Sequence, residues 1–136
     1  MTASESMEAL IAEFVNQRVW AIVGASSDPE KFGHRIFVTL KGAGYTVYPV
    51  NPKDGEIAGD KVYPSLADLP VKPAVVDIVV PPAVAEKIVR QCAGLGLRRV
   101  WLQPGAESQA AIRYCQENGI EVVYGDCAMR RRRRWD

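Results

Sequence analysis

The 136-residue chain has few of the residues on which metal and disulfide chemistry depend. It contains one histidine, His34, and three widely spaced cysteines without a Cys-x-x-Cys pair. A two-histidine metal site, a catalytic Cys–His pair and a disulfide framework are therefore poorly supported. Cys92 and Cys115 fall inside expected helices and are interpreted as core residues, and we expect no metal site.

Long hydrophobic runs and a secretory leader pattern are also missing. No apolar run approaches the ~18 to 20 residues that cross a bilayer, and the N-terminus has no basic region followed by an apolar one. Apolar residues make up 48% of the chain and charged residues 24%, which is typical of a domain that can bury a core. We therefore expect a soluble, cytoplasmic, single-domain protein with no membrane partner.

The body of the chain also lacks a strong positive charge. The 17 basic residues nearly balance the 16 acidic ones, but without the run Arg130 to Arg134 the chain has 12 basic residues against 16 acidic ones, a balance of −4. A basic footprint for nucleic acid is therefore absent outside this run. We interpret residues 130–136 as a solvated, mobile basic tail. The alternatives are that this run contacts nucleic acid or another anion, a ligand's phosphates, or a subunit interface.

Apolar runs with strand character alternate with helical patterns along the chain. Strands are expected at 19–25, 46–50, 75–80, 100–103 and 120–124. The helical patterns between them end at Gly42 to Gly44, at Gly94 or Gly96, and at Gly119. This alternation predicts a Rossmann-like α/β domain: a doubly wound, mostly parallel sheet of about five strands in three α/β/α layers.

The first 18 residues carry an amphipathic helix. Apolar side chains at helical spacing are Met7, Leu10, Ile11, Phe14 and Val15. We expect this helix to pack on the ligand-binding domain, residues 19–129. The same apolar face would also suit a second copy of the chain, so a homodimer stays open.

The loop after the first expected strand has phosphate-binding features. It begins with Gly24, Ala25 and Ser26, and Lys31 stands just before the next helix. Ligands of an open parallel sheet bind outside the carboxyl ends of the strands, and a helix N-terminus there offers N–H groups and a partial positive charge. The loop suits a phosphorylated ligand. Because neither GxGxxG nor the P-loop pattern is present, an ordinary strand-to-helix turn is the alternative.

The end of the second expected strand lacks the acidic residue with which NAD-binding domains hold the ribose. It continues instead as Asn51, Pro52 and Lys53. A lysine here attracts a phosphate on the ribose, either the 3′-phosphate of coenzyme A (CoA) or the 2′-phosphate of NADP. A simple turn is again the alternative, since Asn and Pro favour turns.

Six short motifs follow one another in a recognisable order. They are GAS at 24–26, PVNPK at 49–53, VYPSLADLP at 62–70, VPP at 80–82, WLQPG at 101–105 and DC at 126–127. In this order they resemble the small single-domain CoA-binding proteins of bacteria, which are similar to the N-terminal CoA-binding domain of the succinyl-CoA synthetase alpha subunit. The resemblance spans residues 15–129.

The resemblance implies a Rossmann-like domain that holds CoA across the edge of the sheet. The residues that it places near the phosphates of CoA are Gly24, Ala25, Ser26 and Lys31. Those near the adenosine and its 3′-phosphate are Asn51, Pro52 and Lys53. Those along the pantetheine path are Val80, Pro81, Pro82, Gln103 and Gly105. At VVPP the chain follows the synthetase pattern and departs from the Phe-Arg type of some small proteins.

The same resemblance bears on catalysis. The synthetase has a second domain with a phosphorylated histidine, for which this chain has no counterpart, and His34 lies in the first loop. We therefore expect a protein that binds CoA, acyl-CoA or CoA disulfide, with no catalytic residues of its own. The alternatives are an NADP-binding redox enzyme or sensor, and a subunit that supplies the CoA site to a multi-chain acyl-CoA synthetase.

Two residues after the last expected strand have two interpretations each. The thiol of Cys127 is either a partner for the CoA thiol in a mixed disulfide or a small packed residue. Asp126, the one acid at a strand end, is interpreted as a turn former or a helix-end partner.

Overall fold

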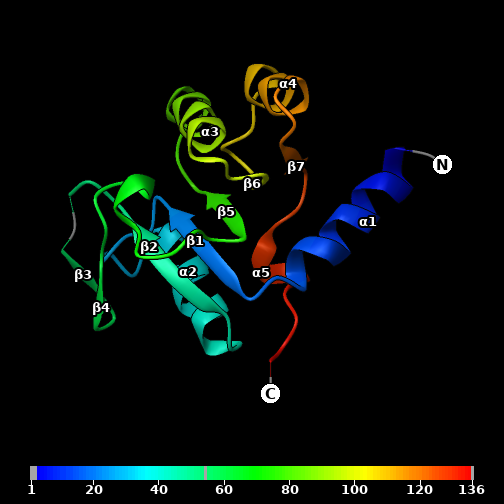
Figure 1. Cartoon of the computed structure of the whole chain (residues 1–136). Helices are drawn as coiled ribbons and strands as arrows, with labels where there is room; N and C mark the ends of the chain where they lie inside the picture. Colours follow the sequence, from blue (N-terminus) through cyan, green and yellow to red (C-terminus); the bar gives the residue numbers. More distant parts are fainter. Residues whose placement is uncertain (1–2, 54, 136) are drawn as a thin grey trace.

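Five parallel strands form the sheet of the computed structural model, which describes residues 3–53 and 55–135, with side chains from Met7 onward. Their order across the sheet is β2 (Thr46–Val50), β1 (Val19–Val23), β5 (Val75–Ile78), β6 (Arg99–Leu102) and β7 (Glu121–Val123) (Figure 1). Neighbouring strands pair in parallel throughout. The predicted α/β fold with a parallel five-stranded sheet is confirmed.

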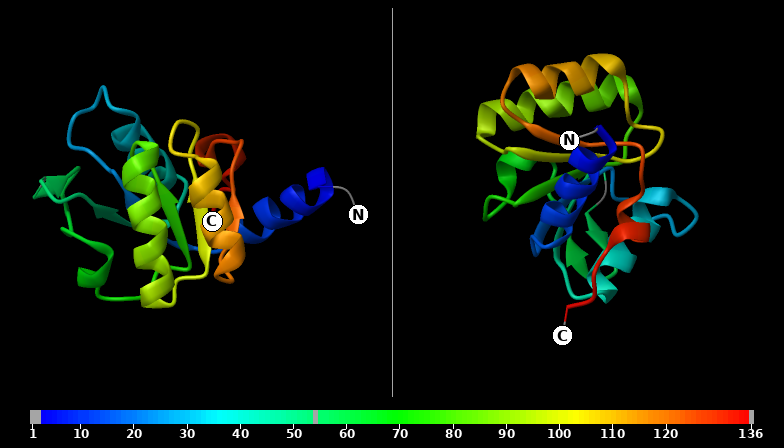
Figure 2. Two further views of the ribbon diagram at one scale, coloured as in Figure 1. Left: turned by 90° about the horizontal axis from the view of Figure 1, so that it is seen from above. Right: turned by 90° about the vertical axis from the view of Figure 1, so that its right-hand side faces the viewer.

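Helices cover both faces of this sheet (Figure 2). One face carries α3 (Pro82–Leu95) and α4 (Gln109–Glu117), and the other carries α2 (Phe32–Gly42), α5 (Ala128–Arg131) and the C-terminal part of α1 (Ala3–Val15). Between β2 and β5 lie the hairpin strands β3 (Glu56–Ile57) and β4 (Asp60–Lys61) and a short 3₁₀ turn, Leu66–Asp68. Within the described residues, no helix is long and apolar enough to cross a membrane.

The two faces of the sheet bury different side chains. The face under α1, α2 and α5 is rich in aromatic residues, including the fully buried Trp101 and Phe37. The face under α3 and α4 is aliphatic and also holds Cys92 and Cys115, as predicted for core residues. Burial raises the pKa of the Cys92 thiol to about 12 and that of Cys115 to about 11, so both stay protonated at neutral pH.

The order of the strands sets the place where a ligand can enter. Counted along the chain, the sheet strands have the spatial order 2-1-3-4-5, as in flavodoxin-like domains. From β1 the chain moves to β2 on one side, and then returns across β1 to β5 on the other. The connections diverge at the carboxyl ends of β1 and β5, and open α/β sheets bind their ligands at such a point.

The described part of the C-terminal tail contacts the domain, which its interpretation as a solvated, mobile run did not anticipate. The guanidinium of Arg131 in α5 forms ion pairs with Glu8 of α1 and with Asp126. Further along, the N–H of Trp135 donates to the carbonyl of Ala43 at 2.8 Å. Some of these partners lie more than a hundred residues away in the sequence, which is why a local charge pattern could not reveal them.

Candidate functional site

The candidate site begins where the connections diverge, at the carboxyl ends of β1, β2 and β5. Backbone hydrogen bonds tie these ends together: the N–H of Gly24 donates to Val50 at 3.0 Å, and that of Val79 donates to Val23 at 2.8 Å. Gly24 has a φ of +98°, and a Cβ atom there would come within 2.4 Å of the Val79 carbonyl oxygen. The close approach of the strand ends therefore requires glycine at this position.

A cavity of about 220 Å³ opens on the α3 side of Gly24, and we name it the α3 cavity. It is lined by Val23, Gly24, Val50, Asn51, Pro52, Pro64, Ser65, Leu66, Val80, Val84, Ile88 and Gln91. Most of these side chains are apolar, and the polar ones are Asn51 after β2, Ser65 before the 3₁₀ turn and Gln91 on α3. Such a lining suits a flat organic ring whose polar edges meet a small number of hydrogen-bonding groups.

A second, more open cavity of about 280 Å³ adjoins the first, and we name it the proline cavity. It is lined by Phe32, Val79, Val80, Pro81, Pro82, Pro104, Gly105 and Ala106. Val80 lines both cavities, so together they form one track along the carboxyl edge of the sheet. The track runs from the end of β2 past β1 and β5 to the loop after β6.

The loop between β1 and α2 spans this track, with Gly24 in one cavity and Phe32 in the other. The helix begins after an exposed Lys31 and has no acidic residue in its first turn. Ser26 is buried, and its hydroxyl oxygen accepts a hydrogen bond from the N–H of Asp28 at 3.1 Å. The helix N-terminus and the lysine offer positive charge beside both cavities, while the exposed Asp28 and Glu30 of the same loop carry negative charge.

The same loop is reinforced from α2. A Cβ atom at Gly33 would lie 2.0 Å from the carbonyl oxygen of Gly24, so α2 begins directly against the loop. His34 donates from Nδ1 to the carbonyl oxygen of Ser26 at 2.8 Å. The histidine thus holds the backbone of the loop.

Asn51 connects the loops that follow β1 and β2. Its Nδ2 donates to the carbonyl of Ala25 at 2.8 Å, and its Oδ1 accepts the N–H of Lys53 at the same distance. The Lys53 side chain is exposed at the rim beside the α3 cavity. Asn51 therefore shapes the rim of the cavity, and Lys53 supplies a charge there.

The ends of β6 and β7 are joined through a fully buried glutamine. Gln103 donates from Nε2 to Cys127 Sγ at 3.2 Å, and its Oε1 accepts the N–H of Ala128 at 2.9 Å. Glu107 accepts hydrogen bonds from the N–H groups of Gly105 and Gly125. These contacts hold the start of α5 against the sheet.

Asp126 is bound by arginines of the same segment. Hydrogen bonds from Arg130, supported by the backbone N–H of Cys127 and by Arg131, lower the pKa of its carboxyl to about 2. The carboxylate is therefore ionised over the whole neutral range. This arrangement agrees with its interpretation as a helix-end partner.

The structure brings most of the predicted site residues to the track. Those lining the α3 cavity are Gly24, Asn51, Pro52 and Val80, and those lining the proline cavity are Val80, Pro81, Pro82 and Gly105. Ala25, Ser26, Lys31 and Lys53 stand in the adjoining loops. Gln103 and Cys127 line neither cavity and contact each other instead.

Part of the lining was not predicted from the sequence. Phe32, Pro64, Val84 and Ile88 contribute apolar surface to the cavities. On an amphipathic helix such residues look like core, and only the 42% exposure of Val84, known from the structure, distinguishes it.

Asp77 was also not singled out, because it stands inside the β5 run of valines and isoleucines. Its carboxyl is fully buried, and neither oxygen has a hydrogen-bond partner among the described residues. Burial therefore raises its pKa well above the ordinary value.

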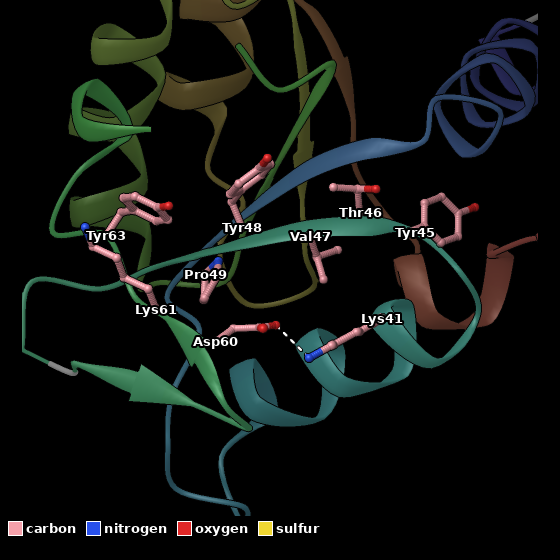
Figure 3. Close-up of a pocket in the computed structure, with 9 residues that line it drawn as sticks. All are labelled: Lys41, Tyr45, Thr46, Val47, Tyr48, Pro49, Asp60, Lys61 and Tyr63. Carbon is pink, nitrogen blue, oxygen red and sulfur yellow. Dashed lines mark ion pairs between the residues drawn. The ribbon is translucent and has the colours of Figure 1, made fainter. Parts of the chain in front are cut away.

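Another hollow, of about 310 Å³, lies outside the edge strand β2 (Figure 3). An ion pair between Lys41 and Asp60, at 2.7 Å, spans it on the α2 side of the strand. Pro49 removes one backbone donor from this edge, and its carbonyl oxygen already accepts the N–H of Tyr63. None of the predicted site residues lines this hollow.

Comparison with known proteins identifies a family over nearly the whole chain. The family described as "CoA binding domain" matches residues 18–133. A structure described as a hypothetical protein from Pyrococcus horikoshii superposes with a TM-score of 0.84 and 35% identity, covering 96% of this chain and 89% of that one.

Two curated relatives differ in length. The chain is 38% identical over 88 residues to the alpha subunit of an ADP-forming acetate–CoA ligase II of Pyrococcus furiosus, an overlap of 64% of this chain and 19% of the relative. It is 29% identical over 107 residues to the uncharacterized protein YneT of Bacillus subtilis, with 79% of each chain covered. The chain thus spans about a fifth of the length of the ligase subunit.

Proposed function

Because the chain belongs to the CoA-binding domain family, we propose that it binds coenzyme A or an acyl-CoA along the track at the carboxyl ends of β1, β2 and β5. One observation carries the proposal. Two largely apolar cavities adjoin at the divergence point of the sheet, and the loop that leads into the N-terminus of α2 spans both. CoA has the matching order of parts, with a diphosphate between an adenosine and a pantetheine arm.

In this proposal the adenine ring occupies the α3 cavity. Pro52, Pro64 and Leu66 offer apolar surface on one side of that cavity, and Val84 and Ile88 offer it on the other. The exposed ammonium of Lys53 pairs with the 3′-phosphate of the ribose. Lysine binds a phosphate as a point charge, so the pair adds affinity without a strict geometry.

The diphosphate lies against the loop of Gly24, Ala25 and Ser26. The first N–H groups of α2 have no partner within the helix, and they attract an anion together with the helix dipole. Lys31 adds a positive charge at the same end of the helix.

The pantetheine arm follows the proline cavity. Val80, Pro81 and Pro82 supply apolar walls for the arm, the two prolines present no backbone N–H to it, and Gly105 leaves the far end open. Gln103 does not line this path, because its side chain and its backbone groups are hydrogen-bonded inside the protein, and it supports the neighbouring Gly105. Cys127 is proposed as a neighbour of the thiol end.

Two further functions are distinguished by simple tests. Relatives named as ligase subunits support a role as the CoA-site subunit of a multi-chain acyl-CoA synthetase, and co-purification with an ATP-binding partner subunit would support it. An NADP-binding function, the other alternative for Lys53, has no support from the family or the relatives.

The proposal is tested by native mass spectrometry of freshly purified protein, followed by calorimetric titration with CoA, dephospho-CoA and NADP. We expect a single CoA-sized adduct that is lost on denaturation, and CoA at 100 times its Kd should raise the free energy of unfolding by about 2.7 kcal/mol. An adduct that survives denaturation and leaves on reduction would assign a disulfide, with Cys127 as the first residue to replace. Absence of binding to CoA at millimolar concentration would contradict the proposal.

A further inference from the structure

An arginine cluster lies at the end of the tail, beside the turn that precedes β2 and away from the track. It consists of Arg18 and Arg133, which flank the Trp135 ring, and of Arg132 and Arg134, the neighbours of Arg133 in the sequence. The Trp135 ring packs edge-on against Tyr45, with ring centroids 5.6 Å apart. This turn stands at the amino ends of the strands, so the cluster is separate from the proposed CoA site at their carboxyl ends.

The cluster holds positive charges together, and no described acidic side chain pairs with them. The guanidinium carbons of Arg18 and Arg133 lie 5.2 and 4.0 Å from the centre of the Trp135 ring. Among the side chains of residues 7–53 and 55–135, no carboxylate lies within 4.0 Å of any of the four arginines. The mutual repulsion of these charges falls when an anion binds among them.

Acidic residues on this side of the molecule are already engaged elsewhere. Glu8 and Asp126 pair with Arg131, and Glu13 pairs with Arg99 at 3.2 Å. Within the part of the chain that the structure describes, the four arginines therefore carry positive charge that no carboxylate pairs with, although the rest of the chain is acidic on balance.

The charges are also held in position before any partner arrives. The N–H of Arg133 donates to the Tyr45 hydroxyl at 3.1 Å, and its guanidinium donates to Asn16 at 3.0 Å. Arg18 donates from Nε to the carbonyl of Gly44 at 3.1 Å. Binding here loses less conformational entropy than binding by a free tail would.

We propose that the arginine cluster binds the phosphodiester backbone of a nucleic acid without reading its bases. Guanidinium groups match phosphate oxygens in geometry, and several fixed cations release counterions from a polyanion. A lipid surface fits less well, because binding there needs an apolar anchor and the one large aromatic ring of the cluster is packed on Tyr45 and covered by guanidiniums.

Fluorescence anisotropy with a labelled 20-nucleotide oligo-dT tests the proposal. The double variant R132Q/R134Q keeps the Arg131 ion pairs and the Arg133 contacts, and the control K87Q/R90Q removes the same charge from exposed positions on α3. We expect the tail variant to raise Kd at 50 mM salt at least about fivefold and the control to change it less than about twofold. The slope of log K against log salt should weaken by about 1.4 in the tail variant, since each single-strand phosphate contact contributes about 0.7.

Each other result contradicts the proposal. No binding by the wild-type protein at 50 mM salt, equal losses in both variants, or displacement of the oligonucleotide by saturating CoA would exclude a separate phosphodiester site. Binding to vesicles containing phosphatidylserine without binding to oligo-dT would assign the cluster to membranes instead. If R132Q/R134Q unfolds, the single variant R134Q decides in its place, because the exposed Arg134 side chain forms no hydrogen bond or ion pair with the described residues.

Discussion

The carboxyl edge of the sheet has two halves that are built differently. At the ends of β1, β2 and β5, together with the loop 104–106 after β6, which we name the ligand half, backbone contacts and glycine shape two cavities. Lys31 and Lys53 are exposed there. At the ends of β6 and β7, the clasp half, the side chains of Gln103 and Asp126 are bound to the protein's own segment 127–131.

The difference distinguishes residues that can serve a ligand from residues that serve the fold. A buried group that already has its hydrogen-bond partners loses them when it turns toward a ligand, whereas an exposed lysine or a cavity wall gains contacts. Position at a strand end is therefore not enough to make a binding residue. The following predictions test this division, in order of decreasing effect.

Replacing Gly24 with alanine should have the largest effect. Alanine at a φ of +98° is strained, and its Cβ would collide with the Val79 carbonyl, so we expect CoA affinity to fall on the order of 100-fold together with stability. The matched control is Gly125→Ala in the clasp half, where φ is +83° and no atom lies within 4 Å. Calorimetry should find CoA affinity unchanged in the control; equal losses would contradict the division.

Asp77 is fully buried in β5, and we expect its ionisation to change the free energy of unfolding without changing the CoA affinity. Because the pKa of Asp77 is higher in the folded than in the unfolded state, the free energy of unfolding is highest below the unfolded pKa of about 3.9. It falls as pH rises from there toward the folded-state pKa. Urea unfolding should show wild type losing about 1.4 kcal/mol per pH unit in this window relative to Asp77→Asn. The same pH slope in both proteins would show that Asp77 finds a partner in solution.

Gln103→Ala should lower the free energy of unfolding and leave the CoA affinity unchanged. Removing the side chain leaves the N–H of Ala128 without its acceptor, which costs about 1–3 kcal/mol in the free energy of unfolding. The same substitution at Gln91, in the wall of the α3 cavity, should give the reverse pattern of weaker CoA binding and unchanged stability. If the Gln103→Ala protein folds and binds CoA tenfold more weakly, Gln103 serves the ligand and the division is contradicted.

Lys53→Gln should weaken CoA binding about tenfold, which is about 1.4 kcal/mol. Dephospho-CoA lacks the 3′-phosphate, so its affinity should change less than about twofold. Titration of both ligands into the variant and into the control Lys87→Gln on α3 checks this. An equal loss for the two ligands would place the lysine elsewhere along CoA.

Asp126→Asn should have the smallest effect and a pH dependence opposite to that of Asp77. The pKa of Asp126 is lowered to about 2, so its contribution is present above about pH 4 and is lost as pH falls toward 2. Thermal unfolding should find the variant slightly less stable than wild type at pH 7 and equal to it near pH 2. A difference that persists at pH 2 would rule out an ionic origin.

Much of the fold could be predicted from the sequence because its strands are buried on both faces. The run at 46–50 gives β2 with the same bounds, and Gly96 and Gly119 end helices as predicted. The hairpin β3–β4 was not predicted, since strands of two residues carry no periodicity.

The site could be predicted at its glycine, proline and lysine positions but not in its walls. Gly24 and Lys53 stand directly after strands, where a local pattern is informative. Val84 and Ile88 reach the α3 cavity only because α3 crosses it, and Arg131 finds Glu8 across 123 residues of sequence. Tertiary contacts of this kind leave no local signal.

The most direct test of the account is to follow backbone amide resonances by NMR while CoA is added to the wild-type protein. Binding at the ligand half predicts large shifts for the amides of residues 24–28, 30–32, 51, 53 and 80, and little change for those of 125–128. Large shifts confined to 125–128, or shifts spread evenly over both halves, would contradict it.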